Sequence, residues 1–137
     1  MRLASCVAIP FVLLLLAIDS TAVAAAPARE AAVLEAQADL FVSTSGNDAW
    51  SGRLSAANAA ATDGPLATIG AAQRLARQIR QAEPDRKRPI VVAIRGGTYW
   101  LTEPIVFSPE DSGTEQAPVV YQAYAGERPI FSGGQDV

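Results

Sequence analysis

The sequence predicts a mostly β fold in which short strands coil into a solenoid behind one capping helix. Short apolar, β-branched runs alternate with Gly, Pro, Ser and Asp between Pro89 and Gly134, a pattern typical of short strands joined by tight corners. One amphipathic helix is expected just before the first buried strand. The chain has 137 residues and includes only a few such strands. We therefore expect an incomplete solenoid whose first turn is covered by that helix.

The helix is expected at residues 69–81. Its apolar side chains recur at helical spacing and form one stripe, made by Ile69, Ala72, Leu75, Ala76 and Ile79. Thr68 is a suitable N-cap residue, and Pro84 ends the helix. The stripe needs an apolar partner, and the open end of the following sheet is the expected one.

The predicted strands are short and are bounded by turn-forming residues. Residues 90–94 are five apolar residues in a row, which is typical of a strand buried on both faces. Gly96 and Gly97 follow and permit a sharp reversal of the chain. Pro residues at the start of later strands do no harm there. The full set of predicted strands is 41–44, 90–94, 98–101, 105–107, 119–124 and 130–131.

The N-terminus predicts export. Residues 1–24 have the features of a signal peptide: a basic Arg2, an apolar run at 7–18 and an Ala-Val-Ala cleavage site at 22–24. A membrane anchor is the alternative, but the run is short for a bilayer core of about 30 Å. We expect a secreted or periplasmic protein with no membrane contact after cleavage. The Ala-rich segment 25–39 is interpreted as a tether or a short helix, and 40–137 as the cap and first turns of a truncated domain.

Composition excludes several functions. The chain has a net charge of −3 and no histidine, which argues against nucleic acid as a partner and excludes histidine-based catalysis within it. Cys6 is the only cysteine and is removed with the signal peptide, so the mature chain has no thiol chemistry. The basic run 86–88 is interpreted as a solvated loop rather than a polyanion site, and nothing marks Lys87 as catalytic. The oligomeric state is not defined by the sequence.

Six motifs occur in order along residues 40–137: FVSTSGND at 41–48, GPLATI at 64–69, RGGTY at 95–99, SPEDSGT at 108–114, APVVY at 117–121 and SGG at 132–134. With these motifs the chain resembles the N-terminal region of secreted right-handed parallel β-helix proteins. These are the pectate-lyase-like, carbohydrate-active superfamily, and the glycoside-hydrolase branch fits better than the lyase branch. The resemblance implies that acids, bases and any calcium site lie on later turns, so no catalytic, cofactor or metal residue is assigned in this chain.

Candidate chemistry within the chain is sparse. Glu110, Asp111 and Glu115 are close in sequence, but glycoside hydrolysis needs two carboxyl groups about 5–10 Å apart around a sugar. A turn is the favoured interpretation of these three residues. Asn47 and Asp48 could offer oxygen atoms to calcium, although a calcium site needs about six or more such ligands.

Aromatic residues are the remaining candidates. Trp50, Tyr99 and Trp100 could stack on sugar rings, with packing beneath the capping helix as the alternative for Tyr99 and Trp100. Our leading hypothesis is a structural N-terminal segment of a secreted glycoside hydrolase that acts on polysaccharide. The alternatives are a polysaccharide lyase segment of the same fold, and a non-catalytic glycan-binding or decayed gene product.

Overall fold

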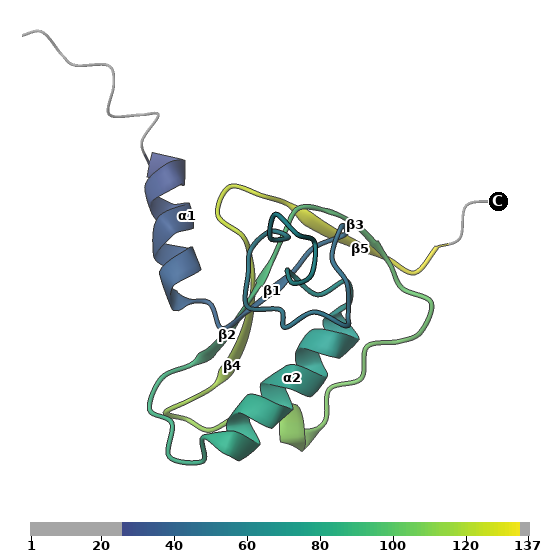
Figure 1. Cartoon of the computed structure of the whole chain (residues 1–137). Helices are drawn as coiled ribbons and strands as arrows, with labels where there is room; N and C mark the ends of the chain where they lie inside the picture. The colour runs from purple at the N-terminus through teal and green to yellow at the C-terminus, as the bar shows by residue number, and fades with distance from the viewer. Residues whose placement is uncertain (1–25, 135–137) are drawn as a thin grey trace, which may run out of the picture.

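The structure, a computed structural model, describes residues 26–134 and contains two α-helices and two small parallel sheets (Figure 1). The helices are α1 (Ala26–Gln37) and α2 (Ile69–Ala82). The strands are β1 (Leu40–Val42), β2 (Ile90–Ile94), β3 (Gly97–Trp100), β4 (Val119–Ala123) and β5 (Pro129–Ser132), and η2 (Pro109–Asp111) is a single 3-10 turn. The predicted signal peptide at 1–24 lies outside the described residues.

Strand β2 is the centre of the larger sheet, which has the order β1-β2-β4 with parallel pairing throughout. Leu40 of β1 pairs with Val92, and Val92 pairs with Tyr121 of β4. Ile90, Val92 and Ala93 have no exposed surface. The predicted double burial of this strand is confirmed, and it follows from β2 having a neighbour on each side and a helix over each face.

Helix α2 covers one face of this sheet. Its N-terminus is capped as predicted, because the Thr68 hydroxyl accepts a hydrogen bond from the Ala71 amide at 3.1 Å. The apolar stripe of α2 packs on side chains that alternate along the strands, namely Leu40, Val42, Ile90, Val92 and Ile94. Tyr121 is partly buried against the same core.

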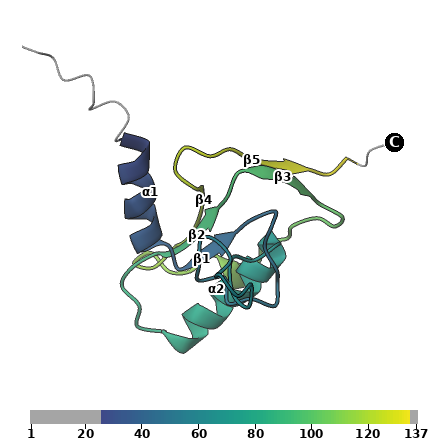
Figure 2. The same cartoon turned by 45° about the horizontal axis from the view of Figure 1, so that its top comes forward.

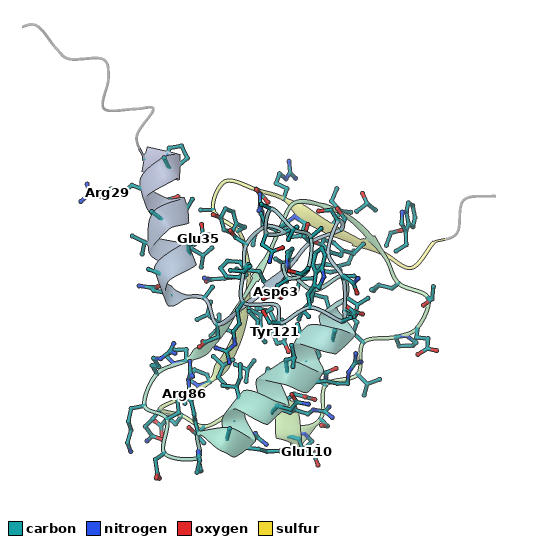
Figure 3. All side chains as sticks on the ribbon, viewed as in Figure 1. Arg29, Glu35, Asp63, Arg86, Glu110 and Tyr121 are labelled. Carbon is teal, nitrogen blue, oxygen red and sulfur yellow. The ribbon has the colours of Figure 1, made fainter. Side chains whose placement is uncertain are left out.

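Helix α1 covers the opposite face. Leu34 is its buried residue and packs with Phe41 and Ala93. Glu35, beside Leu34, accepts hydrogen bonds from the Tyr124 hydroxyl at 2.8 Å and from the Ser55 hydroxyl. Figure 3 shows Glu35 on the side of α1 that faces the strands. The Ala-rich segment is therefore a helix that covers part of the core.

The second sheet extends beyond the first (Figure 2) and pairs β3 with β5 in parallel. Gly97 begins β3 with a φ of 135°, and a Cβ atom there would lie 2.8 Å from the Thr44 side chain. The backbone therefore needs glycine at this corner. Tyr99 of β3 stacks on Phe131 of β5 with ring centroids 5.2 Å apart.

The prediction of a mostly β solenoid is wrong. The described residues form helices of 12 and 14 residues and two separate sheets, whereas no strand exceeds five residues. The larger sheet buries its faces against α2 and α1 in an α/β/α arrangement, and not against another turn of strands. Short parallel strands buried on both faces have the same apolar pattern in both architectures, so the pattern could not distinguish them. The right-handed parallel β-helix is therefore corrected to this layered arrangement.

The predicted strand at 105–107 is also wrong. Val106 and Phe107 are 70% and 55% exposed and pair with no strand. The Val106 carbonyl instead accepts a hydrogen bond from the Gln73 side chain at 2.7 Å, and the Phe107 ring meets Tyr121 edge-on at 5.4 Å. Across residues 26–134, no helix has the length and apolar character required to cross a bilayer.

We expect the Glu35→Ala substitution to loosen α1 without unfolding the sheet. It removes the two hydrogen bonds that join this exposed carboxylate to Tyr124 and Ser55. Amide hydrogen exchange in α1 should become about five- to thirty-fold faster, since each of the two hydrogen bonds contributes at most about 1 kcal/mol at this exposed position. Glu30→Ala is the matched control, because it removes a second exposed glutamate from the same helix. Equal exchange rates in the two variants would contradict this role of Glu35.

Candidate functional site

The three predicted sugar-stacking aromatics lie in different environments. Tyr99 is 6% exposed, and its hydroxyl donates to the Arg95 carbonyl at 2.7 Å. Burial raises the pKa of Tyr99 to about 12, so it remains a neutral phenol in the core. Trp50 is half-buried against Gly64, where a Cβ atom would lie 2.7 Å from the indole ring. Trp100 is 56% exposed and is the most exposed aromatic of the three.

Two adjoining hollows lie beside Trp100. Each has a volume of about 260 Å³, and both are lined by Trp100, Leu101, Thr68 and Ile69. The hollows thus join the exposed end of β3 to the first turn of α2. An exposed aromatic ring next to polar side chains is a common arrangement in ligand-binding grooves.

The polar side chains of these hollows are mainly hydroxyls and amides. Thr44 and Thr98 line the first hollow, while Gln73, Thr102 and Glu103 line the second. Neither lining includes Lys or Arg. A larger hollow of about 550 Å³ lies between α1 and the end of β4, but its lining includes no aromatic side chain.

Asp48 binds the backbone amides just before α2. Its carboxylate accepts hydrogen bonds from the Ala67 amide at 2.8 Å, the Thr68 amide at 2.9 Å and the Thr68 hydroxyl at 2.7 Å. Asn47 accepts a bond from the Ala49 amide at 2.9 Å. These contacts show that Asn47 stabilises the loop and that Asp48 stabilises the backbone just before the helix. Among residues 26–134, no cluster of three or more His, Cys, Asp or Glu could hold a metal.

Asp111 is a buried structural carboxylate. Its side chain is 2% exposed and is held by Arg77, by the Gln73 amide at 2.9 Å and by the Ser108 amide at 2.7 Å. The hydrogen bonds from Arg77 hold the pKa of this carboxyl well below its usual range. Glu110 beside it is 72% exposed, and Glu115 is also exposed. Figure 3 labels Glu110 next to the 3-10 turn below α2. Because Asp111 is bound to Arg77, these three residues fit the predicted turn better than a pair of catalytic carboxyl groups.

A second group of carboxylates lies where α1 meets the strands. Arg95 donates to Glu127 at 2.7 Å and lies over the Tyr124 ring at 4.5 Å. The Arg95 hydrogen bond lowers the pKa of Glu127, and the Ser55 hydroxyl, followed by Tyr124, lowers that of Glu35. A glycosidase acid needs a raised pKa. Every described carboxyl group with a resolved shift has a lowered pKa, which suits fixed negative charges and not a proton donor.

The basic run 86–88 lies in a loop with Lys87 and Arg88 exposed, as predicted, but Arg86 departs from the prediction because its side chain is buried. The Arg86 side chain is 4% exposed and donates to Asp39 at 2.6 Å, and Arg88 donates to the same carboxylate at 2.9 Å. Asp39 also accepts from the Val91 amide at 3.1 Å. The run therefore joins the start of β1 to β2. The sequence contained no local signal for this ion pair, because Asp39 and Arg86 are separated by 47 residues.

Comparison with known proteins gives one informative result. No family model matches the sequence, and no curated protein matches it. A solved structure named "Glycoside hydrolase" matches 70% of this chain with 38% sequence identity and a TM-score of 0.59. This chain resembles part of a glycoside hydrolase.

The match is unequal in length. It covers 15% of the glycoside hydrolase chain, so the described protein corresponds to a small part of that molecule. An identity of 38% over most of the present chain supports a relationship to glycoside hydrolases. The hydrolase likeness that the sequence motifs suggested is thus supported in this general form.

Proposed function

We propose that this chain is a structural N-terminal segment of a secreted glycoside hydrolase that acts on polysaccharide. The observation that carries the proposal is the 38% identity to a glycoside hydrolase over 70% of this chain but only 15% of the other. The state of the carboxylates adds support. Asp111, Glu35 and Glu127 are held by hydrogen bonds with lowered pKa values, and this suits scaffolding. In this proposal the acid and the nucleophile or base belong to other parts of the whole enzyme.

Secretion is proposed from the sequence of residues 1–24, whose basic start, apolar run and small-residue cleavage site fit a signal peptide. It is tested by the mass of the protein recovered outside the cytoplasm. We expect the mass of a chain whose first residue is Ala25. A mass that still includes Met1 would contradict export by cleavage.

The enzymatic proposal is tested on the gene and on its whole product. We expect the reading frame to continue past the Val137 codon and the complete protein to release new reducing ends from polysaccharides. A stop codon after Val137, with a secreted product of matching mass, would overturn the hydrolase proposal and favour a binding-only or decayed product. Release of unsaturated products absorbing in the ultraviolet would identify a polysaccharide lyase instead.

A further inference from the structure

We propose that Trp100 and the two hollows beside it bind a neutral, uncharged glycan chain. This inference depends on the proposed function only for the general class of ligand, a carbohydrate. The site itself is argued from its exposed aromatic ring, its hydroxyl lining and its charge.

The exposed ring provides a platform for a sugar. Trp100 is 56% exposed on β3, a strand that is fixed by pairing with β5 and by the buried side chain of Tyr99. The electron-rich face of an indole attracts the polarised C–H groups on one face of a sugar ring, in addition to burying apolar area. The two hollows share Trp100 as lining, so adjacent sugars of one chain could contact the same ring.

The polar lining matches sugar hydroxyls. Thr44 and Thr98 line one hollow and Gln73 lines the other. The Gln73 NH2 group already donates to the Val106 carbonyl and to Asp111, so Gln73 offers a ligand only its carbonyl oxygen as an acceptor. Hydroxyl and amide groups both donate and accept hydrogen bonds, as sugar hydroxyls do. Such groups at the edge of an aromatic surface fix the orientation of a ligand without requiring it to carry charge.

The charges of the site favour a neutral ligand over an acidic one. The Asp48 carboxylate accepts hydrogen bonds from the Ala67 and Thr68 amides at 2.8 and 2.9 Å, so a negative charge already lies just before the N-terminus of α2. Glu103 lines the second hollow, and neither lining includes a basic residue. A uronate or sulfated sugar would therefore meet negative charge with no lining cation to offset it. Arg74 approaches the rim at Gly70, where its Nη1 would lie 3.8 Å from a Cβ atom, so this residue is included in the test.

The test uses the chain from Ala25 to Val137 and its two tryptophans. The indole N–H signals of Trp50 and Trp100 are followed by NMR while cellohexaose, xylohexaose or hexagalacturonate is added. We expect at least one neutral hexamer to shift the Trp100 signal and leave the Trp50 signal in place, with hexagalacturonate having a much smaller effect. Trp100→Ala should weaken the binding about ten-fold or more, as expected for loss of a stacking surface. Trp50→Phe is the matched control and should bind as the parent does.

Three results would overturn the inference. These are an unmoved Trp100 signal with both neutral hexamers, unchanged affinity in a folded Trp100→Ala variant, or hexagalacturonate binding that equals the neutral binding and is lost in Arg74→Gln. Because Trp100 is mostly exposed, the Trp100→Ala variant should remain folded, and its NMR signals should stay as dispersed as those of the parent. The NMR titration measures binding at Trp100 and does not depend on cleavage of the glycan. A negative titration would therefore contradict this inference without contradicting the hydrolase proposal. A stop codon after Val137 combined with Trp100-dependent binding would overturn the hydrolase proposal and support this inference.

Discussion

Replacing Asp39 with alanine should lower the free energy of unfolding by about 3–4 kcal/mol, since it leaves a buried charge without its main partner. The Asp39 and Arg86 side chains are 9% and 4% exposed, and the Arg86 Nη2 atom lies 2.6 Å from the carboxylate. The substitution also deprives the Val91 amide of its acceptor. Urea unfolding followed by circular dichroism measures the loss directly.

Two further variants make the Asp39 prediction specific. Glu83→Gln removes the other ion-pair partner of Arg86. The Glu83 side chain is 56% exposed, so this change should lower the free energy of unfolding by no more than about 0.5 kcal/mol. The double variant Asp39→Asn with Arg86→Met keeps an acceptor for Val91 and removes the buried charge. It should recover at least about half of the loss, because a buried ion pair can be replaced by neutral groups at little cost. Equal effects of Asp39→Ala and Glu83→Gln would show that burial of this pair has no energetic consequence.

The second large effect is expected at Asp111. Asp111→Asn keeps the shape of the side chain but removes the charge that binds Arg77, and should cost about 2–3 kcal/mol at pH 7. The expected cost is large because the Asp111 side chain is 2% exposed and joins η2 to α2 through Arg77 and Gln73. Glu110→Gln is the matched control at the adjacent, 72% exposed position and should be nearly neutral.

The Asp111 contribution should depend on pH in a defined direction. Arg77 lowers the pKa of Asp111 in the folded state, whereas an unfolded aspartate titrates near about 4. The stabilisation is therefore complete above about pH 4 and is lost as the pH falls below that value. The difference in unfolding free energy between the parent and Asp111→Asn should shrink from pH 7 to pH 3. A constant difference across this range would contradict the assignment of the effect to charge.

Local elements were predictable where the signal was local. The α2 helix begins and ends within a residue or so of its predicted bounds, because Thr68, the apolar stripe and Pro84 are all within it or adjacent to it. The β2 strand has its predicted bounds, 90–94, for the same reason. Residues 105–107 show the limit of such signals: their apolar composition is that of a strand, but no strand lies beside them to pair with.

The architecture was not predictable, because it depends on what covers the sheet. Helix α1 has a single buried residue, Leu34, so its sequence carries almost no amphipathic pattern. Without a predicted helix on the second face, another turn of strands was the natural cover for β2. The candidate site was partly predictable: Trp100 was among the aromatic candidates, but its exposure and the burial of Tyr99 depend on the β3–β5 pairing.

The pairing of β1 with β2 has a consequence for how the chain is made. Residues 52 and 66 supply the first backbone partners of β1, through the Phe41–Gly52 and Phe41–Leu66 hydrogen bonds and the Val42–Leu66 bridge. Leu40 pairs with Val92, so β1 lacks its β2 neighbour until the ribosome has added about 50 more residues, which takes about 3–10 s at normal synthesis rates. The sheet is completed only after Ala123, which pairs with Ile94, has also been made. Folding must therefore wait for contacts distant in sequence, which makes it slow relative to a helical chain of this length. Until β2 is made, the edge of β1 that pairs with β2 is available to chaperones.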